Sequence, residues 1–207
     1  MHVYGLTGGI ASGKSAAAKL LHGYGIPVVA ADELARLVVC PGSHGLAQVV
    51  DAFGLGVLDR DGELDRRAMG KIVFSNPARR KQLEAILHPC IQDRYTHVLA
   101  ALEEAGHGVV VYEVPLLFEN NLQRDMRGVG LLYAPQDLRV KRACARDKIT
   151  TEDALARMAA QMDEEEKYRR ANYILYNDGS LDDLRREVEL FATRFLKLAR
   201  TRLLATG

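Results

Sequence analysis

One segment near the start of the chain constrains the fold more than any other. Residues 8–15 read GGIASGKS and match the pattern G-x-x-x-x-G-K-[ST] at every fixed position. An apolar run, Val3–Leu6, precedes the match, and a helical pattern from Lys14 to His22 follows it. The motif carries weight only in this strand–loop–helix context. The segment therefore predicts a phosphate-binding loop between a buried strand and a helix.

The chemistry of phosphate binding explains the spacing. Gly8 and Gly13 let the backbone turn tightly, so that successive N–H groups converge on one phosphate. Lys14 is expected to reach the β- and γ-phosphates, and the Ser15 hydroxyl to ligate Mg²⁺. The predicted nucleotide-binding residues of the loop are Gly8, Gly9, Ala11, Ser12, Gly13, Lys14, Ser15 and Ala16.

Short apolar runs alternate with longer amphipathic ones along the chain, which is typical of α/β proteins with a parallel sheet. Ser180 is expected to cap the final helix, with Asp183 three residues later. Asn76-Pro77 is expected to open a helix that His88-Pro89 breaks, so that a second helix continues to about Glu104. The predicted strands are Val3–Leu6, Pro27–Ala30, Val109–Glu113, Val129–Tyr133 and Tyr173–Tyr176, and further helices are predicted at Pro135–Arg146 and Thr151–Met162.

Residues 33–105 contain no convincing strand, which suggests a helical insertion between the second and third strands. The charged residues 139–170 form a second candidate lobe. The alternative for both segments is a set of helices packed on the sheet. We expect a single domain, with core segments 1–34, 105–138 and 171–207, an insertion at 35–104 and a lid at 139–170.

Composition narrows the class of protein. The formal net charge of +1 gives no electrostatic footprint for nucleic acid or an acidic membrane. No apolar run approaches 18 residues, and the chain starts without a signal-peptide pattern. The three cysteines show no CxxC spacing and are expected to be reduced thiols. We therefore expect a cytoplasmic protein that does not bind nucleic acid or membrane.

Other phosphate-loop classes fit less well. A GTPase would need the guanine-reading pattern N-K-x-D, which the sequence does not contain. Asp59-Arg60-Asp61-Gly62 matches a switch-like D-x-x-G, but no apolar strand precedes it, so a surface turn is favoured.

The chain resembles the dephospho-coenzyme A kinases, a family of P-loop kinases. The resemblance runs from Tyr4 to about Leu184. It implies a three-layer α/β sandwich with a five-stranded parallel sheet, a helical substrate lobe and a small lid. It further implies transfer of phosphate from Mg·ATP to the ribose 3′-hydroxyl of dephospho-coenzyme A, the last step of coenzyme A synthesis. The motifs that carry it are GLTGGIASGKS at 5–15, Ala31-Asp32, Ala35-Arg36, Pro41-Gly42, Phe53-Gly54, GELDR at 62–66, LEAILHP at 83–89, VPLLFE at 114–119, Arg142–Asp147, Gln161 and Asn177-Asp178-Gly179.

Three positions depart from the family pattern. Ala16 replaces a common threonine, which removes one phosphate contact. Glu113 and Asn172 stand where the family often has aspartate. Glu113 still supplies a carboxylate at the end of a strand, so a water-mediated Mg²⁺ role stays open.

Asp32 directly follows the apolar run of the second strand. Ligands of open parallel sheets gather at the carboxyl ends of strands, where this carboxylate could accept the proton of the attacking hydroxyl. Aspartate is also a favoured helix N-cap, here for residues 33–39. Position alone does not separate the two interpretations; the resemblance implies a catalytic and substrate-binding role.

Arg142 and Arg146 lie four residues apart and so share a helix face, with Arg139 one turn earlier. Arginines of a lid would neutralise charge on the transferring phosphoryl group. The alternative is a solvated basic face paired with Asp147 or the acidic run 163–166. Within a P-loop kinase we predict catalytic roles for Arg142 and Arg146, with Arg142 also binding nucleotide, and leave Arg139 open.

The resemblance implies substrate contacts for Arg66, His88 and Gln161. Gln161 is similar to a family position near the nucleotide or lid, and the alternative for it is a plain polar helix residue. Asp65 is expected to cap the helix that Arg66 begins, and His88 is alternatively a core histidine at the proline break. Asn177-Asp178-Gly179 follows the last strand, where related folds wrap the adenine; the alternative is a plain turn. Two rival functions remain at this level: a nucleoside or nucleotide kinase with another acceptor, and a nucleotide-binding switch without turnover.

Overall fold

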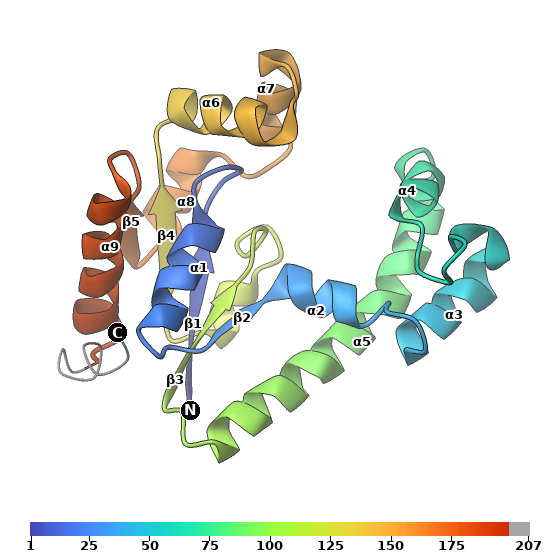
Figure 1. Ribbon diagram of the computed structural model, residues 1–207, viewed down its shortest axis with the longest axis horizontal. Helices are drawn as coiled ribbons and strands as arrows, with labels where there is room; N and C mark the ends of the chain where they lie inside the picture. The colour runs from blue at the N-terminus through green and yellow to red at the C-terminus, as the bar shows by residue number, and fades with distance from the viewer. Residues whose placement is uncertain (199–207) are drawn as a thin grey trace. The chain divides into compact units, whose positions relative to one another are not determined.

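The computed structural model describes residues 1–198, and the chain forms two compact units in it (Figure 1). The first unit comprises Met1–Val29 and the chain from Gly106 onward; the second is Ala30–Ala105. Residues 199–207, the end of the predicted core segment 171–207, lie outside the described residues. Among the described residues, no helix is long and apolar enough to cross a membrane.

The sheet has the predicted five strands, in the order β2-β3-β1-β4-β5. The pairs β1·β3, β1·β4 and β4·β5 are parallel, with Tyr4 opposite Val111 and Thr7 opposite Leu131. β2 begins one residue later than expected, although the Pro27 carbonyl still accepts a hydrogen bond from Val111 N. The strands are β1 (His2–Thr7), β2 (Val28–Ala30), β3 (Val109–Glu113), β4 (Val129–Tyr133) and β5 (Tyr173–Tyr176).

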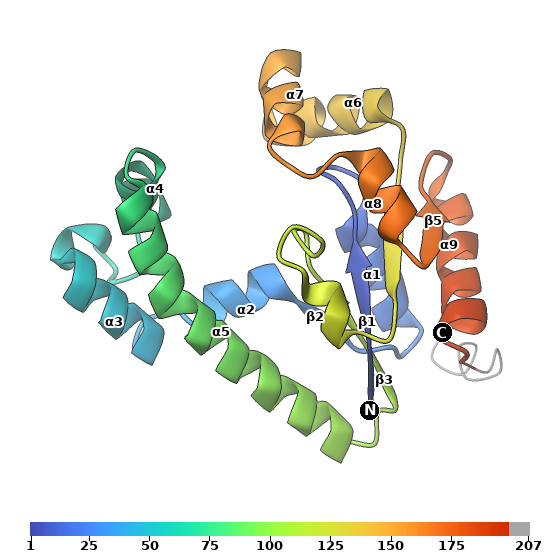
Figure 2. The same ribbon diagram turned by 180° about the vertical axis from the view of Figure 1, so that it is seen from behind.

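Helices cover both faces of this sheet. α1 and α9 lie on one face and α8 on the other, as the two opposite views show (Figures 1 and 2). Leu6, Leu21 and Phe191 are fully buried between the sheet and the first pair of helices. The helical elements of the first unit are α1 (Lys14–Gly23), η2 (Leu122–Asp125), α6 (Gln136–Asp147), α7 (Thr151–Ala159), α8 (Glu164–Arg170), α9 (Leu181–Leu190) and η3 (Phe191–Phe195).

Two helix ends in this unit are set by side-chain hydrogen bonds. Ser180 and Asp183 form the expected capping box at the start of α9. The predicted helix 151–162 is too long, because α7 ends at Ala159. The Met162 N–H donates instead to the carboxylate of Glu119, and Asp163 caps a new helix, α8.

The second unit is helical beyond Ala30, the last residue of β2. An isolated bridge between Leu58 and Leu64 closes the turn over 59–62, where Asp59 Oδ1 accepts hydrogen bonds from the N–H groups of Asp61 and Glu63. The D-x-x-G match is thus a surface turn, as predicted. The elements are α2 (Ala31–Leu37), α3 (His44–Phe53), η1 (Leu55–Val57), α4 (Arg66–Phe74) and α5 (Pro77–Glu104).

The expected break at His88-Pro89 is wrong. α5 is one helix from Pro77 to Glu104 with Pro89 inside it. An internal proline removes one hydrogen bond and costs about 3 kcal/mol. Leu87 before it and Ile91 after it both pack against the cluster of Val38, Val39 and Leu46. Packing on both sides of the proline keeps the helix continuous.

Candidate active site

The phosphate loop connects β1 to α1 and has the backbone that its glycines predict. Gly13 has a φ of 100°, in the left-handed region that favours glycine. A Cβ at Gly13 would also collide with the side-chain amide of Asn177. Lys14 Nζ donates to the carbonyl oxygens of Gly8 at 2.8 Å and Gly9 at 3.2 Å. The loop therefore curls around the lysine ammonium.

The first turn of α1 suits an anion. The helix starts at Lys14, has no side-chain cap and carries no acidic residue in its first turn. The N–H groups at the start of a helix and the helix dipole favour negative charge at this end. Ser15 is exposed in the same turn. These features support the prediction that a phosphate binds at the first turn of α1.

Asn177 joins three parts of this site. Its backbone N–H donates to Tyr133 O at 2.8 Å, and its Nδ2 donates to Ser12 O at 2.7 Å. Its own carbonyl oxygen accepts a hydrogen bond from Arg142 Nη1 at 3.0 Å. Asn177 thus connects Arg142 to the phosphate loop. The plain-turn interpretation of Asn177 is wrong, since this side chain is 7% exposed and braces the loop.

Arg139, left open by the sequence, lies directly against the phosphate loop at Gly9. It is 5% exposed, and its Nε donates to Ala134 O at 3.1 Å. Its Nη1 forms an ion pair with Glu164 Oε2 at 3.3 Å. Both groups stand against Gly9, where a Cβ would meet each of them.

Arg146 points away from this cluster. Its Nε and Nη2 donate to both carboxylate oxygens of Asp147, at 2.7 and 3.0 Å. Asp147 also pairs with Arg157. The hydrogen bond from Arg146 is the main cause that lowers the pKa of the Asp147 carboxyl. This is the surface ion pair that the sequence offered as the alternative.

Gln161 does contact the loop. Its Oε1 accepts a hydrogen bond from Ile10 N at 3.0 Å, across 151 residues of sequence. The next residue, Met162, is held through its N–H by Glu119. The structure therefore brings together the loop residues 8–16, Arg142, Gln161 and two groups that sequence reasoning did not assign, Asn177 and Arg139.

Glu113 is the last residue of β3 and lies in register with Leu6 of β1. Its carboxylate and the Ser15 hydroxyl belong to segments that leave the carboxyl ends of neighbouring strands. Oxygen ligands of these two kinds suit Mg²⁺, which usually takes one or two protein oxygens and completes its shell with phosphates and water. The donor set thus fits the metal that the motif implies.

The other three predicted residues belong to the helical unit. Asp32 is the second residue of α2, with an exposed side chain, and the N-cap position is Ala30. The interpretation of Asp32 as a cap for residues 33–39 is therefore wrong. Arg66 opens α4, which Asp65 caps as predicted. His88 is exposed on α5, so it is not a core histidine.

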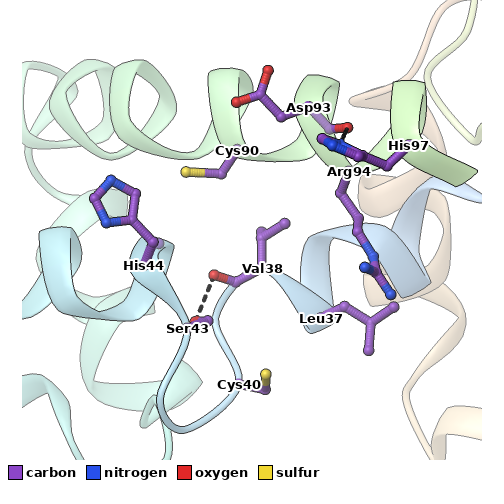
Figure 3. Close-up of a pocket in the computed structure, with 10 residues that line it drawn as sticks. Leu37, Val38, Cys40, Ser43, His44, Cys90, Asp93, Arg94 and His97 are labelled. Atoms are coloured by element: carbon purple, nitrogen blue, oxygen red, sulfur yellow. Dashed lines mark hydrogen bonds between the residues drawn. The ribbon is translucent and has the colours of Figure 1, made fainter.

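The helical unit contains a groove of about 410 Å³ between the end of α2, the start of α3 and the middle of α5 (Figure 3). Ser43 lines the groove and holds the turn between α2 and α3, because its Oγ accepts a hydrogen bond from Leu46 N and donates one to Val38 O. Its lining mixes apolar, thiol, nitrogen-bearing and carboxylate side chains, among them Leu37, Cys90, Arg94, His97 and Asp93.

Comparisons with known proteins agree on one family. Residues 2–183 match the family model described as dephospho-CoA kinase. A dephospho-CoA kinase of Geobacillus kaustophilus is 42% identical over 184 residues, 89% of this chain and 92% of that protein. The dephospho-CoA kinase structure from Campylobacter jejuni covers 94% of this chain and 97% of its own, at 30% identity and a TM-score of 0.70. A Thermus thermophilus structure, TT1252, covers 96% of this chain and 98% of its own, at 39% identity and a TM-score of 0.82.

Proposed function

Because the chain belongs to the dephospho-CoA kinase family, we propose that its phosphate loop positions ATP for transfer of the γ-phosphoryl group to the ribose 3′-hydroxyl of dephospho-CoA. As a member of this family the protein is an ATP-using kinase of coenzyme A biosynthesis. The observation that carries the proposal is the loop itself, with Lys14 at the uncapped start of α1 and Gly13 in the left-handed conformation. Lys14 holds the β- and γ-phosphates, together with the N–H groups of the loop.

The side chains near the loop supply positive charge. Asn177 accepts a hydrogen bond from Arg142 and donates one to the Ser12 carbonyl of the loop. A change in the Arg142 side-chain conformation would therefore bring its guanidinium to the bound phosphates. A guanidinium there offsets the charge that develops on the transferring group. Arg146 is proposed to take part only by leaving Asp147, which makes its contribution the smaller one.

Mg²⁺ would be held by the Ser15 hydroxyl, with the Glu113 carboxylate as a further oxygen close to the same strand ends. When bound, the ion neutralises charge between the β- and γ-phosphates.

We assign the acceptor to the helical unit. Asp32 would receive or orient the attacking hydroxyl, and Arg66 and His88, both exposed, would contact the rest of dephospho-CoA. The division into a core, an insertion at 35–104 and a lid at 139–170 belongs to the same proposal. The groove of Figure 3 offers apolar walls and nitrogen donors such as Arg94, which suit an acceptor that combines an aliphatic amide arm with phosphates.

ADP release tests the proposal against its two rivals. Turnover with dephospho-CoA, but not with AMP or nucleosides, is the expected result. Turnover with AMP or a nucleoside would instead indicate a kinase with another acceptor. ATP binding without ADP release for any acceptor would indicate a nucleotide-binding switch. The cytoplasmic location and the absence of nucleic-acid binding stay predictions from the sequence.

A further inference from the structure

A buried ion pair joins Glu119 to Lys167, and neither residue belongs to the set that the proposed mechanism uses. Lys167 of α8 is 0% exposed, and its Nζ stands 2.9 Å from Oε1 of Glu119, whose side chain is 19% exposed. Glu119 ends the VPLLFE segment that follows β3. Figure 2 shows α8, which carries Lys167, on the rear face of the sheet. The pair therefore connects the loop after β3 to α8.

The same carboxylate oxygen has a second partner. Glu119 Oε1 accepts a hydrogen bond from Met162 N at 3.0 Å. Burial acts to raise the pKa of Glu119, but the nearby Lys167 ammonium and the hydrogen bond from Met162 outweigh it and leave the pKa below its ordinary value. The carboxylate is thus ionised at neutral pH. It accepts a hydrogen bond from Met162, just before α8, and forms an ion pair with Lys167 within α8.

Met162 adjoins the residue that contacts the phosphate loop. Gln161 Oε1 receives the N–H of Ile10 at 3.0 Å. A two-residue segment is therefore fixed on one side to Glu119 and on the other to the loop. Because residues 161 and 162 are adjacent in the chain, a displacement of Met162 at Glu119 also moves Gln161 at the loop.

The phosphate loop contains a strained residue next to the one that Gln161 contacts. Ala11, the residue after Ile10, has a φ of 58°. A left-handed conformation at a residue with a Cβ costs roughly 1–2 kcal/mol and persists where the surroundings hold it. The Ile10 N–H that donates to Gln161 belongs to the Gly9–Ile10 peptide, and Ile10 directly precedes this strained residue.

Stability alone does not account for the pair. Replacing a buried ion pair by apolar side chains of similar volume is often neutral or stabilising. A feature that brings little stability yet fixes one segment at one place is better explained by geometry.

We propose that Glu119 is a positioning residue for nucleotide binding, which acts through Met162 and Gln161 to hold the phosphate loop at Ile10. The inference rests on the proposed role of the loop in binding ATP. Glu119 itself is not placed in contact with nucleotide; its effect passes through the segment 161–162.

The test combines Glu119→Gln, Gln161→Ala and the double variant, with KM for ATP, KM for dephospho-CoA and melting temperature measured for each. Glu119→Gln and Gln161→Ala should each raise KM for ATP roughly fivefold, the effect of one hydrogen bond, and leave KM for dephospho-CoA within about twofold. In the double variant the increase should be no larger than in Gln161→Ala alone, because both changes release the same contact. Glu166→Gln is the matched control: it removes a carboxylate of α8 that pairs at the surface with Arg169 and Arg170, and KM for ATP should not change.

A fourth variant separates positioning from stability. Glu119→Leu with Lys167→Met removes both buried charges and should return the melting temperature to near the parental value, while KM for ATP stays raised. A parental KM for ATP in this folded variant, or fully additive effects of Glu119→Gln and Gln161→Ala, would overturn the proposal. Calorimetry of ATP binding by the parent protein checks the proposed role of the loop separately. If the parent does not bind ATP, the role of the loop in ATP binding is refuted, and the proposed effect of Glu119 on it falls as well.

Discussion

Asp32→Asn is the change that most directly probes the proposed chemistry. The residue is the second of α2 and its side chain is exposed. Removing its charge from the first turn of a helix costs about 0.3–1 kcal/mol of stability through the helix dipole. A positioned general base, by contrast, contributes about 10²–10⁴-fold in rate, which is about 2.7–5.4 kcal/mol of activation free energy. The two roles therefore differ severalfold in free energy and in the quantity that they affect.

The neighbouring residue provides a matched control. Glu33 lies in the same first turn, is exposed, and carries the same charge. Glu33→Gln should thus cost the same fraction of a kcal/mol in stability as Asp32→Asn, but it should leave the rate unchanged. The assay is the single-turnover rate of phosphoryl transfer at saturating Mg·ATP and dephospho-CoA, with a melting curve for each variant.

We expect Asp32→Asn to lower this rate by about two to four orders of magnitude while ATP still binds. Two results would refute the reasoning: a rate within a few-fold of the parent, or equal losses in the Asp32 and Glu33 variants. The first would leave the acceptor hydroxyl without its proposed partner, and the second would reduce both residues to a general effect of charge on α2.

Three further predictions follow from the loop, the lid and the last helix. Lys14→Ala should weaken ATP binding and nearly abolish turnover, whereas Ser15→Ala should chiefly raise the Mg²⁺ concentration needed; near-normal rates for both at low Mg²⁺ would contradict the loop assignment. Arg142→Ala should lower kcat more than it raises KM for dephospho-CoA, and more than Arg146→Ala does, since the second arginine is engaged by an ion pair; a drop in melting temperature alone would make α6 a structural face. The hydrogen bonds of Ser180 lower the pKa of Asp183 from 3.8 to about 2, so its stabilising effect is complete above pH 3.8 and lost as the pH falls toward 2, and Asp183→Asn should flatten this part of the melting-temperature profile.

Local signals in the sequence predicted the elements well. Three of the five strands have the predicted bounds, and the caps Asp65, Asn76 and Ser180 all accept the expected backbone hydrogen bonds. Caps and short buried strands depend on neighbours within a few residues, so their pattern is complete in the sequence. Pro89 shows the limit of the same reasoning. Its local cost is real, but Val38 and Val39, which follow α2, and Leu46 of α3, all more than 40 positions away, decide the outcome through the residues that pack on them from either side of the proline.

The site residues divide in the same way. The loop motif specifies the groups that bind phosphate, because they are contiguous. The contacts that brace the loop come from 151 and 165 residues away, through Gln161 and Asn177. Each of these side chains forms a hydrogen bond with a backbone group of the loop. Every residue has such backbone groups, so the identity of the loop residue does not reveal the contact. Sequence alone therefore offered a polar helix residue for the first and a turn for the second.

Gly13 illustrates how the two kinds of information combine. The motif explains this glycine by backbone conformation, and its φ of 100° agrees. The structure adds a second reason, since any Cβ at this position would occupy the place of the Asn177 amide. That amide holds Ser12 O on one side, while the carbonyl oxygen of the same residue holds Arg142 on the other. A side chain at position 13 would thus strain the loop and also displace Asn177, the residue that holds Arg142. The last glycine of the motif therefore serves two parts of the site, the loop that binds phosphate and the arginine proposed to close over it.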